Sequence, residues 1–436
     1  MNKKNASDAR SSNQVSRRDL LLGAATGAVC LTAGTRRDVA HAASARPARD
    51  AGTVEARETI DLSRQHAFYG TAEQAGVMTP QQRHIVYTTF DLATTKRSDL
   101  QVLLARWSAA IARLMKGESA AAPLELEPSL YSGVGFETGE AHGLGPAALT
   151  VTVGLGPKVF TDTYGLAHRR PALLRALKRL PSDNLKPEFT GGDLSLQVCA
   201  DDLQVAYHAV RFLARIAKET GAADIRWMVE GFLSAPASAS DGPGTPRNLL
   251  GFKDGTRNIH AHESEAVDKF VRVQDGPAWQ RNGSYQVVRK IRMYLESWDT
   301  DQIGDQNDIF GRHKSTGAPL TGNVEFDDPD FHKKDGDGNP VIPDNSHIRL
   351  VSYENNGFRI LRRSYNYTEG IDQLGALDAG LLFICYQNDP ARFETLQGKL
   401  GASDELNEYI THIGSAIFFV PPAPPVGAYI GQPIFA

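Results

Sequence analysis

Apolar positions recur along this chain with two different spacings. Residues 84–92 (HIVYTTFDL) are strand-like, whereas from Ser98 apolar residues follow at 100, 103, 104, 107, 111 and 114, which is the spacing of one face of a helix. Strand-like and helix-like segments then alternate through the rest of the chain. We predict strands at 84–92, 149–153, 194–199, 225–233, 285–298, 358–367, 381–387 and 416–420, and helices from Ser98, at 203–218 and at 390–400.

Two of these segments are similar to each other. Residues 194–202 (LSLQVCADD) and 381–389 (LLFICYQND) are each an apolar strand that carries one cysteine and ends in an acidic turn before a predicted helix. Two such halves indicate a duplicated α+β unit with antiparallel sheets covered by helices. Residues 234–246 (SAPASASDGPGTP) are rich in Gly and Pro and form the predicted junction, so we expect halves at 61–238 and 239–436.

The N-terminus has the features of an export signal. Arg17 and Arg18 precede a weakly apolar, Gly/Ala-rich stretch, and residues 40–42 (AHA) provide an A-x-A cleavage site. A chance basic pair in a tail and a lipoprotein signal at Cys30 are the alternatives, and Val29 disfavours the second. We therefore predict a twin-arginine signal peptide at 1–42, a flexible lead at 43–60, and a periplasmic or extracellular protein. Because this route carries folded proteins, it also hints at a cofactor inserted before export.

Composition narrows the class of protein. Hydrophobic content of 41% and charged content of 22% are typical of a soluble globular protein, and no apolar run reaches the ~18 residues of a membrane-spanning helix. A net charge of −4 without a basic stripe argues against a nucleic-acid partner. Cys199 and Cys385 lie in apolar strands, which favours buried thiols over a disulfide. The chain has no C-x-x-C-H motif, so any haem is held without thioether bonds.

Three segments offer candidate chemistry. Asp254 lies between glycines in 251–258 (GFKDGTRN), and such glycines let the backbone approach a flat ligand, although the pattern alone favours an ordinary Asp-Gly turn. His347 stands at a polar-to-apolar transition, interpreted as a strand start, and histidine is the natural axial ligand of a haem without thioethers. Arg362 and Arg363 are adjacent in a predicted strand, so they face opposite sides, and one of them can point into a pocket.

Taken together, the motifs resemble the dye-decolourising peroxidases, most closely the exported bacterial branch that includes the iron-uptake peroxidase/deferrochelatase proteins. The likeness runs from about Phe68 to the C-terminus. It rests on FYGTAEQAGVMTPQQ, TVGLGPKVF, GGDLSLQVCADD, NLLGFKDGTRN, GSYQVVRKIRMYLESW, IFGRHKSTGAPL, SHIRL and ILRRSYNY. This resemblance implies two ferredoxin-like α+β halves of the dimeric α+β barrel type. It also implies one non-covalent haem b per chain, bound in the C-terminal half.

The resemblance also assigns residues. His347 is expected to be the proximal iron ligand, Asp254 the distal acid/base and Arg362 the distal charge stabiliser. Gly255, Thr256 and Arg257 are expected along the haem edge, with Arg363 facing away.

Two segments depart from the family pattern. Residues 71–76 (TAEQAG) lack the histidine that relatives carry there, and 352–354 (SYE) replace their Asn-Pro-Arg. Which residue pairs with the haem propionate therefore stays open, and Arg257 and Arg349 are the candidates.

The expected activity is that of a haem peroxidase that reduces hydrogen peroxide and oxidises dyes or phenolic donors in one-electron steps. The main alternative is deferrochelatase-like release of iron from haem, with components of an iron-uptake system as partners. An exported α+β protein without a cofactor is a third. We also expect a homo-oligomer, no nucleic-acid partner and no membrane span.

Overall fold

The computed structural model describes residues 60–120, 137–234 and 244–436. The predicted signal peptide at 1–42 and all but the last residue of the predicted lead at 43–60 lie outside these residues, as does most of the predicted junction. The boundary between 61–238 and 239–436 therefore stays a prediction. Contacts group Ala56–Ala436 into one unit, whose elements are described below.

The strands are β1 (His84–Leu92), β2 (Thr150–Leu155), β3 (Leu194–Ala200), β4 (Ala223–Phe232), β5 (Ser284–Met293), β6 (Leu361–Arg362), β7 (Tyr365–Ile371), β8 (Leu377–Gln387) and β9 (Ile410–Val420). The α-helices are α1 (Arg97–Leu114), α2 (Leu203–Glu219), α3 (Ser264–Phe270), α4 (Leu295–Trp298), α5 (Ile303–Phe310), α6 (His347–Val351), α7 (Tyr353–Asn356) and α8 (Ala391–Ser403). Short 3₁₀ turns join them, including η6 (Glu405–Glu408).

Both halves have the same strand order. In the first half the order is β4-β1-β3-β2, with α1 after the first strand and α2 after the third. In the second it is β9-β5-β8-β7, and α8 again follows the third strand. All these pairings are antiparallel. Each half is thus a ferredoxin-like unit, and the predicted fold class is confirmed.

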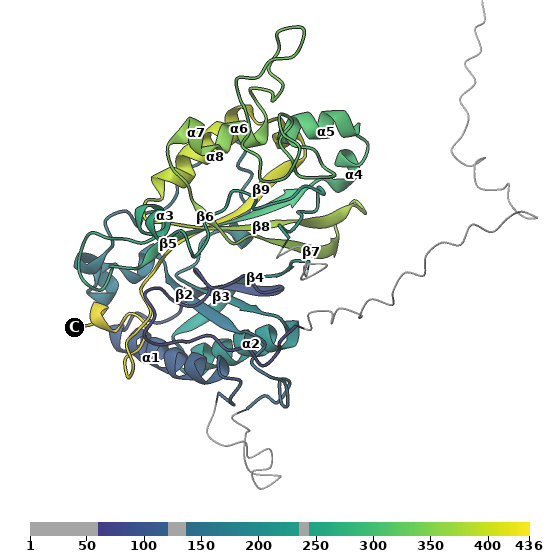
Figure 1. Ribbon diagram of the computed structural model, residues 1–436. Helices are drawn as coiled ribbons and strands as arrows, with labels where there is room; N and C mark the ends of the chain where they lie inside the picture. The colour runs from purple at the N-terminus through teal and green to yellow at the C-terminus, as the bar shows by residue number, and fades with distance from the viewer. Residues whose placement is uncertain (1–59, 121–136, 235–243) are drawn as a thin grey trace, which may run out of the picture. The chain divides into compact units, whose positions relative to one another are not determined.

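The two sheets close on each other. At one seam β2 pairs with β9 through Leu155 and Phe419, and at the other β4 pairs with β7 through Gly231–Tyr367 and Phe232–Asn366. Together with the β5–β8 pairing these seams complete a barrel. The helices lie outside it, with α1 and α2 over the first half and α5, α6 and α8 over the second (Figure 1).

The predicted periodicity of α1 corresponds to its buried face. The six apolar positions from Leu100 to Leu114 are all buried. Trp107 also donates its indole N–H to the carbonyl of Leu213 at 2.8 Å, which fastens α1 to α2. Cys199 and Cys385 are buried free thiols, as predicted.

Four predicted strands are wrong in extent: those at 416–420 and 381–387 begin earlier, at Ile410 and Leu377, and two others are not continuous strands. The segment predicted as one strand at 285–298 leaves the sheet after Met293 and turns into α4. Trp298 is completely buried there against Phe252 and Phe310, so packing outweighs the alternating pattern. The segment predicted at 358–367 starts only at Leu361 and is interrupted between β6 and β7, although both pieces pair with β8.

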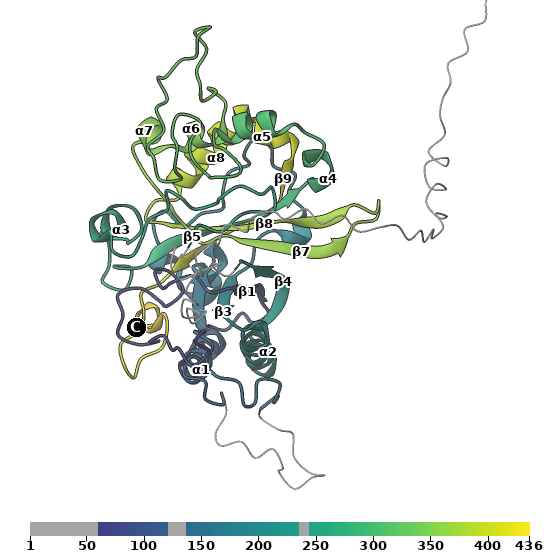
Figure 2. The same ribbon diagram turned by 45° about the vertical axis from the view of Figure 1, so that its right-hand side comes forward.

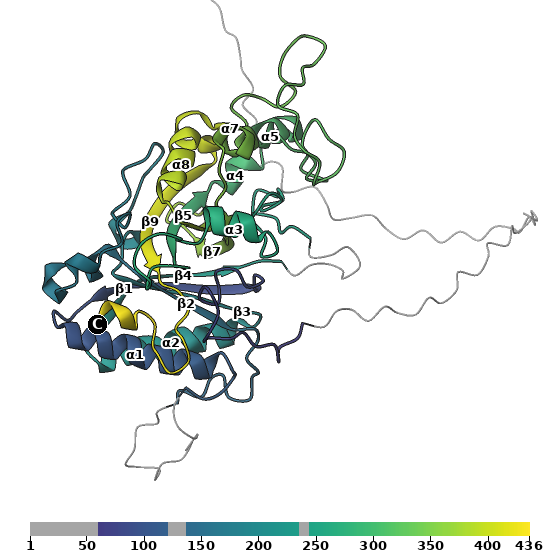
Figure 3. The same cartoon turned by 60° about the vertical axis from the view of Figure 1, so that its left-hand side comes forward.

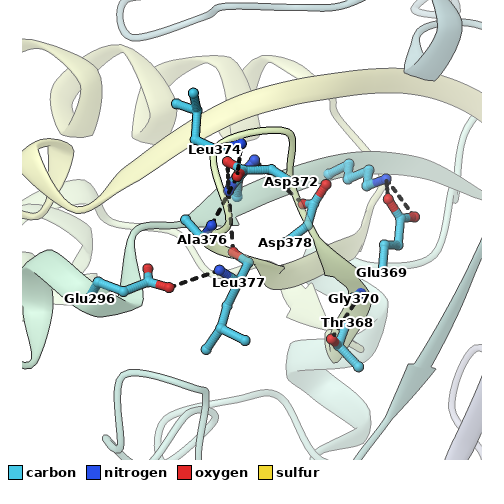
Figure 4. Close-up of polar contacts among 11 residues, drawn as sticks. Glu296, Thr368, Glu369, Gly370, Asp372, Leu374, Ala376, Leu377 and Asp378 are labelled. Carbon is cyan, nitrogen blue, oxygen red and sulfur yellow. Dashed lines mark hydrogen bonds and ion pairs between the residues drawn. The ribbon is translucent and has the colours of Figure 1, made fainter.

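The β7–β8 hairpin extends beyond the helical layers (Figure 2) and its turn is held by carboxylates (Figure 4). Asp372 accepts the backbone N–H groups of Leu374 and Ala376 at 2.8 and 3.0 Å and an N–H of Arg292 on β5 at 2.8 Å. Among the helices that the structure describes, none is long and apolar enough to cross a membrane.

Candidate active site

A cavity of about 890 Å³ opens in the second half, between its sheet and its helices. Its floor includes apolar residues of β5 and β8, such as Ile291 and Phe383, and its opposite wall includes Leu396 and Leu400 of α8. Figure 3 shows α8 beside β9 over this part of the sheet. The cavity thus has apolar surfaces on the sheet and on α8, and charged side chains such as Asp254, Arg312 and Arg362 line other parts of it.

All six residues predicted for the site line this one cavity: Asp254, Gly255, Thr256, Arg257, His347 and Arg362. They come from a loop, from the start of α6 and from β6, and they span 108 positions of the chain. The fold therefore brings together what the sequence places far apart.

Asp254 and Arg362 form an ion pair within the cavity. The Asp254 N–H donates to the carbonyl of Pro246 at 2.8 Å. The Asn258 carboxamide forms two hydrogen bonds with the backbone of Arg362. It accepts the Arg362 N–H and donates to the Arg362 carbonyl, each at 2.8 Å. Sequence reasoning assigned no role to Asn258, although it lies in the same motif as Asp254.

Arg362 stays a cation at neutral pH in spite of its surroundings. Burial lowers the pKa of its guanidinium to about 10, which is still well above 7. Its guanidinium carbon lies 5.6 Å from the centre of the Phe383 ring, and its buried Nε finds no hydrogen-bond partner among the described residues. A guanidinium that stays positive at neutral pH therefore lines the cavity beside Asp254.

Arg363 faces the other way, as expected for the next residue of a strand. Its guanidinium contacts the carbonyl of Thr79 and lies 3.3 Å from Oε1 of Gln82, in the first half of the chain. Arg363 is buried, with 5% of its surface exposed. It thus connects the two halves and is not a solvated partner of Arg362.

His347 is the first residue of helix α6, so its interpretation as the start of a strand is wrong. Its Nδ1 lies 2.7 Å from Oδ2 of Asp404, whose side chain is only 3% exposed. The other carboxylate oxygen of Asp404 accepts the Leu406 N–H at 2.9 Å and caps η6. With Nδ1 engaged in this way, Nε2 is the ring nitrogen left for a ligand in the cavity.

Asp404 is the main functional residue that sequence reasoning missed. It lies 57 positions after His347, and its only local signal is that of a helix cap before Glu405. Nothing in that spacing links it to an imidazole.

Gly255 is needed for its backbone conformation. Its φ of +127° is strained for any residue with a side chain, and it lies directly after Asp254. Gly251, at the start of the same loop, has a φ of +88°, and a Cβ there would meet the Lys314 side chain. The glycines that flank the aspartate therefore set the path of the loop past the cavity.

Most arginines of the cavity already have a carboxylate partner. Arg257 contacts Glu354 at 2.9 Å and Asp328 at 3.4 Å, and Arg359 contacts Glu263 at 2.6 Å. Arg349, the other candidate for a propionate, does not line the cavity and contacts Asp344 at 2.7 Å. Both candidates for the propionate are therefore engaged elsewhere in this structure.

Arg312 differs from these arginines. It lines the cavity with 5% of its surface exposed, and one Nη donates to the carbonyls of Gly317 at 2.6 Å and Glu325 at 3.0 Å. No carboxylate of the described residues lies within ion-pair distance of it. Burial, helped by the nearby positive charge of Arg257, lowers the pKa of its guanidinium.

Comparisons with known proteins agree with this geometry. The family model "Dyp-type peroxidase, N-terminal" matches residues 74–233, and "Dyp-type peroxidase, C-terminal" matches residues 245–424. Deferrochelatase of Yersinia pestis is 38% identical over 415 residues, covering 93% of this chain and 92% of that protein. Deferrochelatase of Escherichia coli O157:H7 is 37% identical over 420 residues, covering 94% of each.

Solved structures give the same result. An oxyferrous complex of DtpA from Streptomyces lividans is 40% identical, with a TM-score of 0.79, and covers 86% of this chain and 98% of that one. A DyP-type peroxidase from Cellulomonas bogoriensis is 38% identical, with a TM-score of 0.76 and the same coverage. The chain therefore belongs to the Dyp-type peroxidase family, as its motifs predicted.

Proposed function

We propose that this peroxidase uses His347 as the iron ligand of a haem, and Asp254 and Arg362 as the pair that activates hydrogen peroxide. The observation that carries the proposal is that an oriented imidazole and a carboxylate–guanidinium pair line one apolar cavity. These residues fit a haem: apolar side chains of β5, β8 and α8 line much of the cavity, and within the described part of the chain Nε2 of His347 has no hydrogen-bond partner.

The chemistry divides between the cofactor and the chain. Bound haem supplies an iron that binds peroxide and takes up its oxidising equivalents. Asp254 would take a proton from one oxygen of the peroxide and deliver it to the other, which leaves. Arg362 stabilises the negative charge that develops as the O–O bond breaks, and its pKa of about 10 keeps it positive while it does so.

His347 and Asp404 act as a unit. The Asp404 carboxylate fixes the His347 ring with its proton on Nδ1 and so leaves the lone pair of Nε2 for the iron. A histidine that binds a metal through one ring nitrogen needs a hydrogen bond at the other nitrogen to keep its orientation, and Asp404 provides it.

Arg312 is the arginine we assign to a propionate of the haem. A buried guanidinium without a carboxylate is costly, and an anion of the cofactor would offset that cost. Arg312→Leu is expected to weaken haem binding in a titration of the apoprotein. The same change at Arg349, which lies outside the cavity lining, is the matched control and should leave binding unchanged.

One spectrum tests the core of the proposal. The purified protein should show a Soret band that shifts after one equivalent of hydrogen peroxide and returns when a phenolic donor or a dye is added. A protein without the band, or a band that peroxide does not change, would contradict the proposed function. Oxidation of dyes belongs to this proposal and is measured in the same cuvette.

Release of iron from haem is a second candidate, because curated relatives at 37–38% identity are named Deferrochelatase. The same haem-contacting residues serve both activities. Product analysis separates them, since oxidised donor with intact haem supports the peroxidase, whereas free iron with metal-free porphyrin supports the alternative.

The cellular setting is also a proposal. Residues 1–42 direct the folded protein through the twin-arginine route to the periplasm or beyond, where it works as a homo-oligomer. Replacing Arg17 and Arg18 by Lys should retain the protein in the cytoplasm, measured by cell fractionation.

A further inference from the structure

Two large hydrophobic side chains are exposed at the rim of the cavity. Over residues 60–120, 137–234 and 244–436, Phe326 and Tyr353 are the two exposed large hydrophobic side chains that also line the cavity, and they are 69% and 43% exposed. Others, such as Leu374 on the β7–β8 turn, are exposed elsewhere on the surface. An exposed ring at the opening of a binding cavity offers a contact surface for a ligand.

The position of Phe326 is fixed by the residue before it. Glu325 is only 8% exposed, and its carboxylate accepts the Thr256 hydroxyl at 2.9 Å and pairs with Lys253. Thr256 and Lys253 belong to the loop that carries Asp254. This anchor holds Phe326 beside the same loop, so a molecule that packs on its ring lies close to the proposed site of reaction.

Arg257 of this loop connects the two rim segments. Its guanidinium contacts Glu354, the residue after Tyr353, at 2.9 Å, and Asp328, two residues after Phe326, at 3.4 Å. Two carboxylates therefore face one guanidinium. Because the charge of Arg257 is already balanced, an anionic donor gains little attraction from it.

A carboxylate without a cationic partner follows Phe326 directly. Asp327 lines the cavity, and no Lys, Arg or His in the described part of the chain lies within ion-pair distance of it. Its Oδ2 accepts the backbone N–H groups of Asn323 and Val324 at 2.7 and 3.0 Å, and these hydrogen bonds hold the pKa of its carboxyl below the usual value. The rim at Phe326 therefore combines an exposed ring with a negative charge.

We propose that Phe326 and Asp327 form a subsite at the mouth of the cavity that selects cationic aromatic donors. The inference rests on the proposed peroxidase function and adds which donors it prefers, while the electron transfer from the donor is unchanged. A positively charged aromatic donor packs on the Phe326 ring, and its charge is attracted by the face of that ring and by Asp327. An anionic donor of similar size meets Asp327 as a like charge and binds less tightly.

The test is binding of dyes to the holoenzyme without peroxide, measured by equilibrium dialysis. The probes are crystal violet, a triarylmethane cation, and patent blue, a sulfonated triarylmethane of net negative charge. Crystal violet should bind about tenfold more tightly at low ionic strength. The difference should shrink as added salt screens the charges.

Phe326→Ala removes the ring from the subsite. It should weaken binding of crystal violet about 2- to 10-fold, and raise the KM for oxidation of this dye without changing kcat. Phe326→Tyr keeps a ring and should keep the affinity. Leu374→Ala is the matched control, because Leu374 is 93% exposed but does not line the cavity, and it should bind crystal violet like the natural protein.

Asp327→Asn removes the charge and keeps an oxygen for the N–H groups of Asn323 and Val324. It should weaken binding of crystal violet and reduce the dependence of this binding on salt, while binding of patent blue should not weaken. Asp162→Asn is the control, because Asp162 is an exposed carboxylate of the first half and lies outside the cavity lining. It should leave the binding of both dyes unchanged.

The outcomes separate the two proposals. If the haem band of the natural protein does not respond to peroxide, the proposed function fails. If it responds but crystal violet binds no better than patent blue, or binds equally well to Phe326→Ala, the inference about the subsite is overturned while the peroxidase stands. A change of oligomeric state in Phe326→Ala, measured by size-exclusion chromatography, would also overturn it, because Phe326 would then belong to an interface between copies of the chain.

Discussion

Replacing Asp404 by Asn tests the least expected part of the site. The change keeps the size of the side chain and an oxygen that can cap η6 through the Leu406 N–H, 2.9 Å away in the natural protein. It removes the negative charge that faces Nδ1 of His347. With the amide oxygen on the Leu406 N–H, the NH2 group of Asn faces Nδ1, and this group is a donor that cannot accept a hydrogen bond from the ring.

The magnitude follows from the geometry of the bond. Nδ1 and Oδ2 are 2.7 Å apart and the carboxylate is 3% exposed, so this is a hydrogen bond to a charged and poorly solvated group. Such bonds contribute about 1.5–3 kcal/mol. With about 1.4 kcal/mol for each tenfold change, haem affinity should fall about 10- to 100-fold.

The assay is titration of the apoprotein with haemin at the Soret band, with Asp328→Asn as the control. Asp328 is 91% exposed and lies 3.4 Å from Arg257, so its loss should leave affinity unchanged. The thermal midpoint of the Asp404→Asn apoprotein should stay close to that of the natural one because the cap is preserved. Unchanged haem affinity in Asp404→Asn would refute the role assigned to this carboxylate.

Three further predictions concern charge, pH and closure of the barrel. Arg362→Leu should keep the haem band but slow the reaction with peroxide about 10²- to 10³-fold in stopped flow, and loss of the band itself would contradict this division of labour. Burial, together with the charge of Arg289, lowers the pKa of His412 to about 3, so the folded protein holds a neutral ring, whereas the unfolded chain binds a proton below about pH 6.5. The free energy of unfolding should therefore fall by about 2 kcal/mol between pH 6.5 and pH 5. Urea unfolding of His412→Gln should show a correspondingly smaller dependence of this free energy on pH. An equal dependence in both proteins would count against the explanation. Gly380→Ala would press a methyl group against the backbone carbonyl of Ile291 in the β5–β8 pairing. The free energy of unfolding should fall by about 1–3 kcal/mol in the same assay. An unchanged value would show that the strands can separate freely there.

Local patterns predicted most of the secondary structure. The helix from Ser98 and the strand at 84–92 were recognisable because their buried faces repeat with the period of the element. The similar segments 194–202 and 381–389 correspond to β3 and β8, the third strands of the two halves, each followed by a helix. The pattern failed at 294–298, where burial of Trp298 against distant rings decides the conformation.

The sequence also indicated the chemistry of the site through short motifs. Glycines around Asp254, a histidine in SHIRL and two adjacent arginines each carry a local signal, and the family resemblance assigned their roles. It placed Arg363 away from the site, which agrees with its contact to Thr79. These signals depend only on residues that are neighbours in the sequence, so they can be recognised before the fold is known.

Tertiary structure alone decided which groups work together. Asp404 reaches His347 across 57 positions, Asn258 clamps Arg362 across 104, and Asp301 meets Tyr409 across 108. Each of these pairs forms because the β5–β8–β9 part of the sheet and its helices pack against each other. The partner of a hydrogen bond is fixed by packing in space, so the spacing of residues along the chain contains no trace of it. The sequence therefore indicated the candidate iron ligand and the candidate reactive pair, whereas the fold determined which side chains hold them in place.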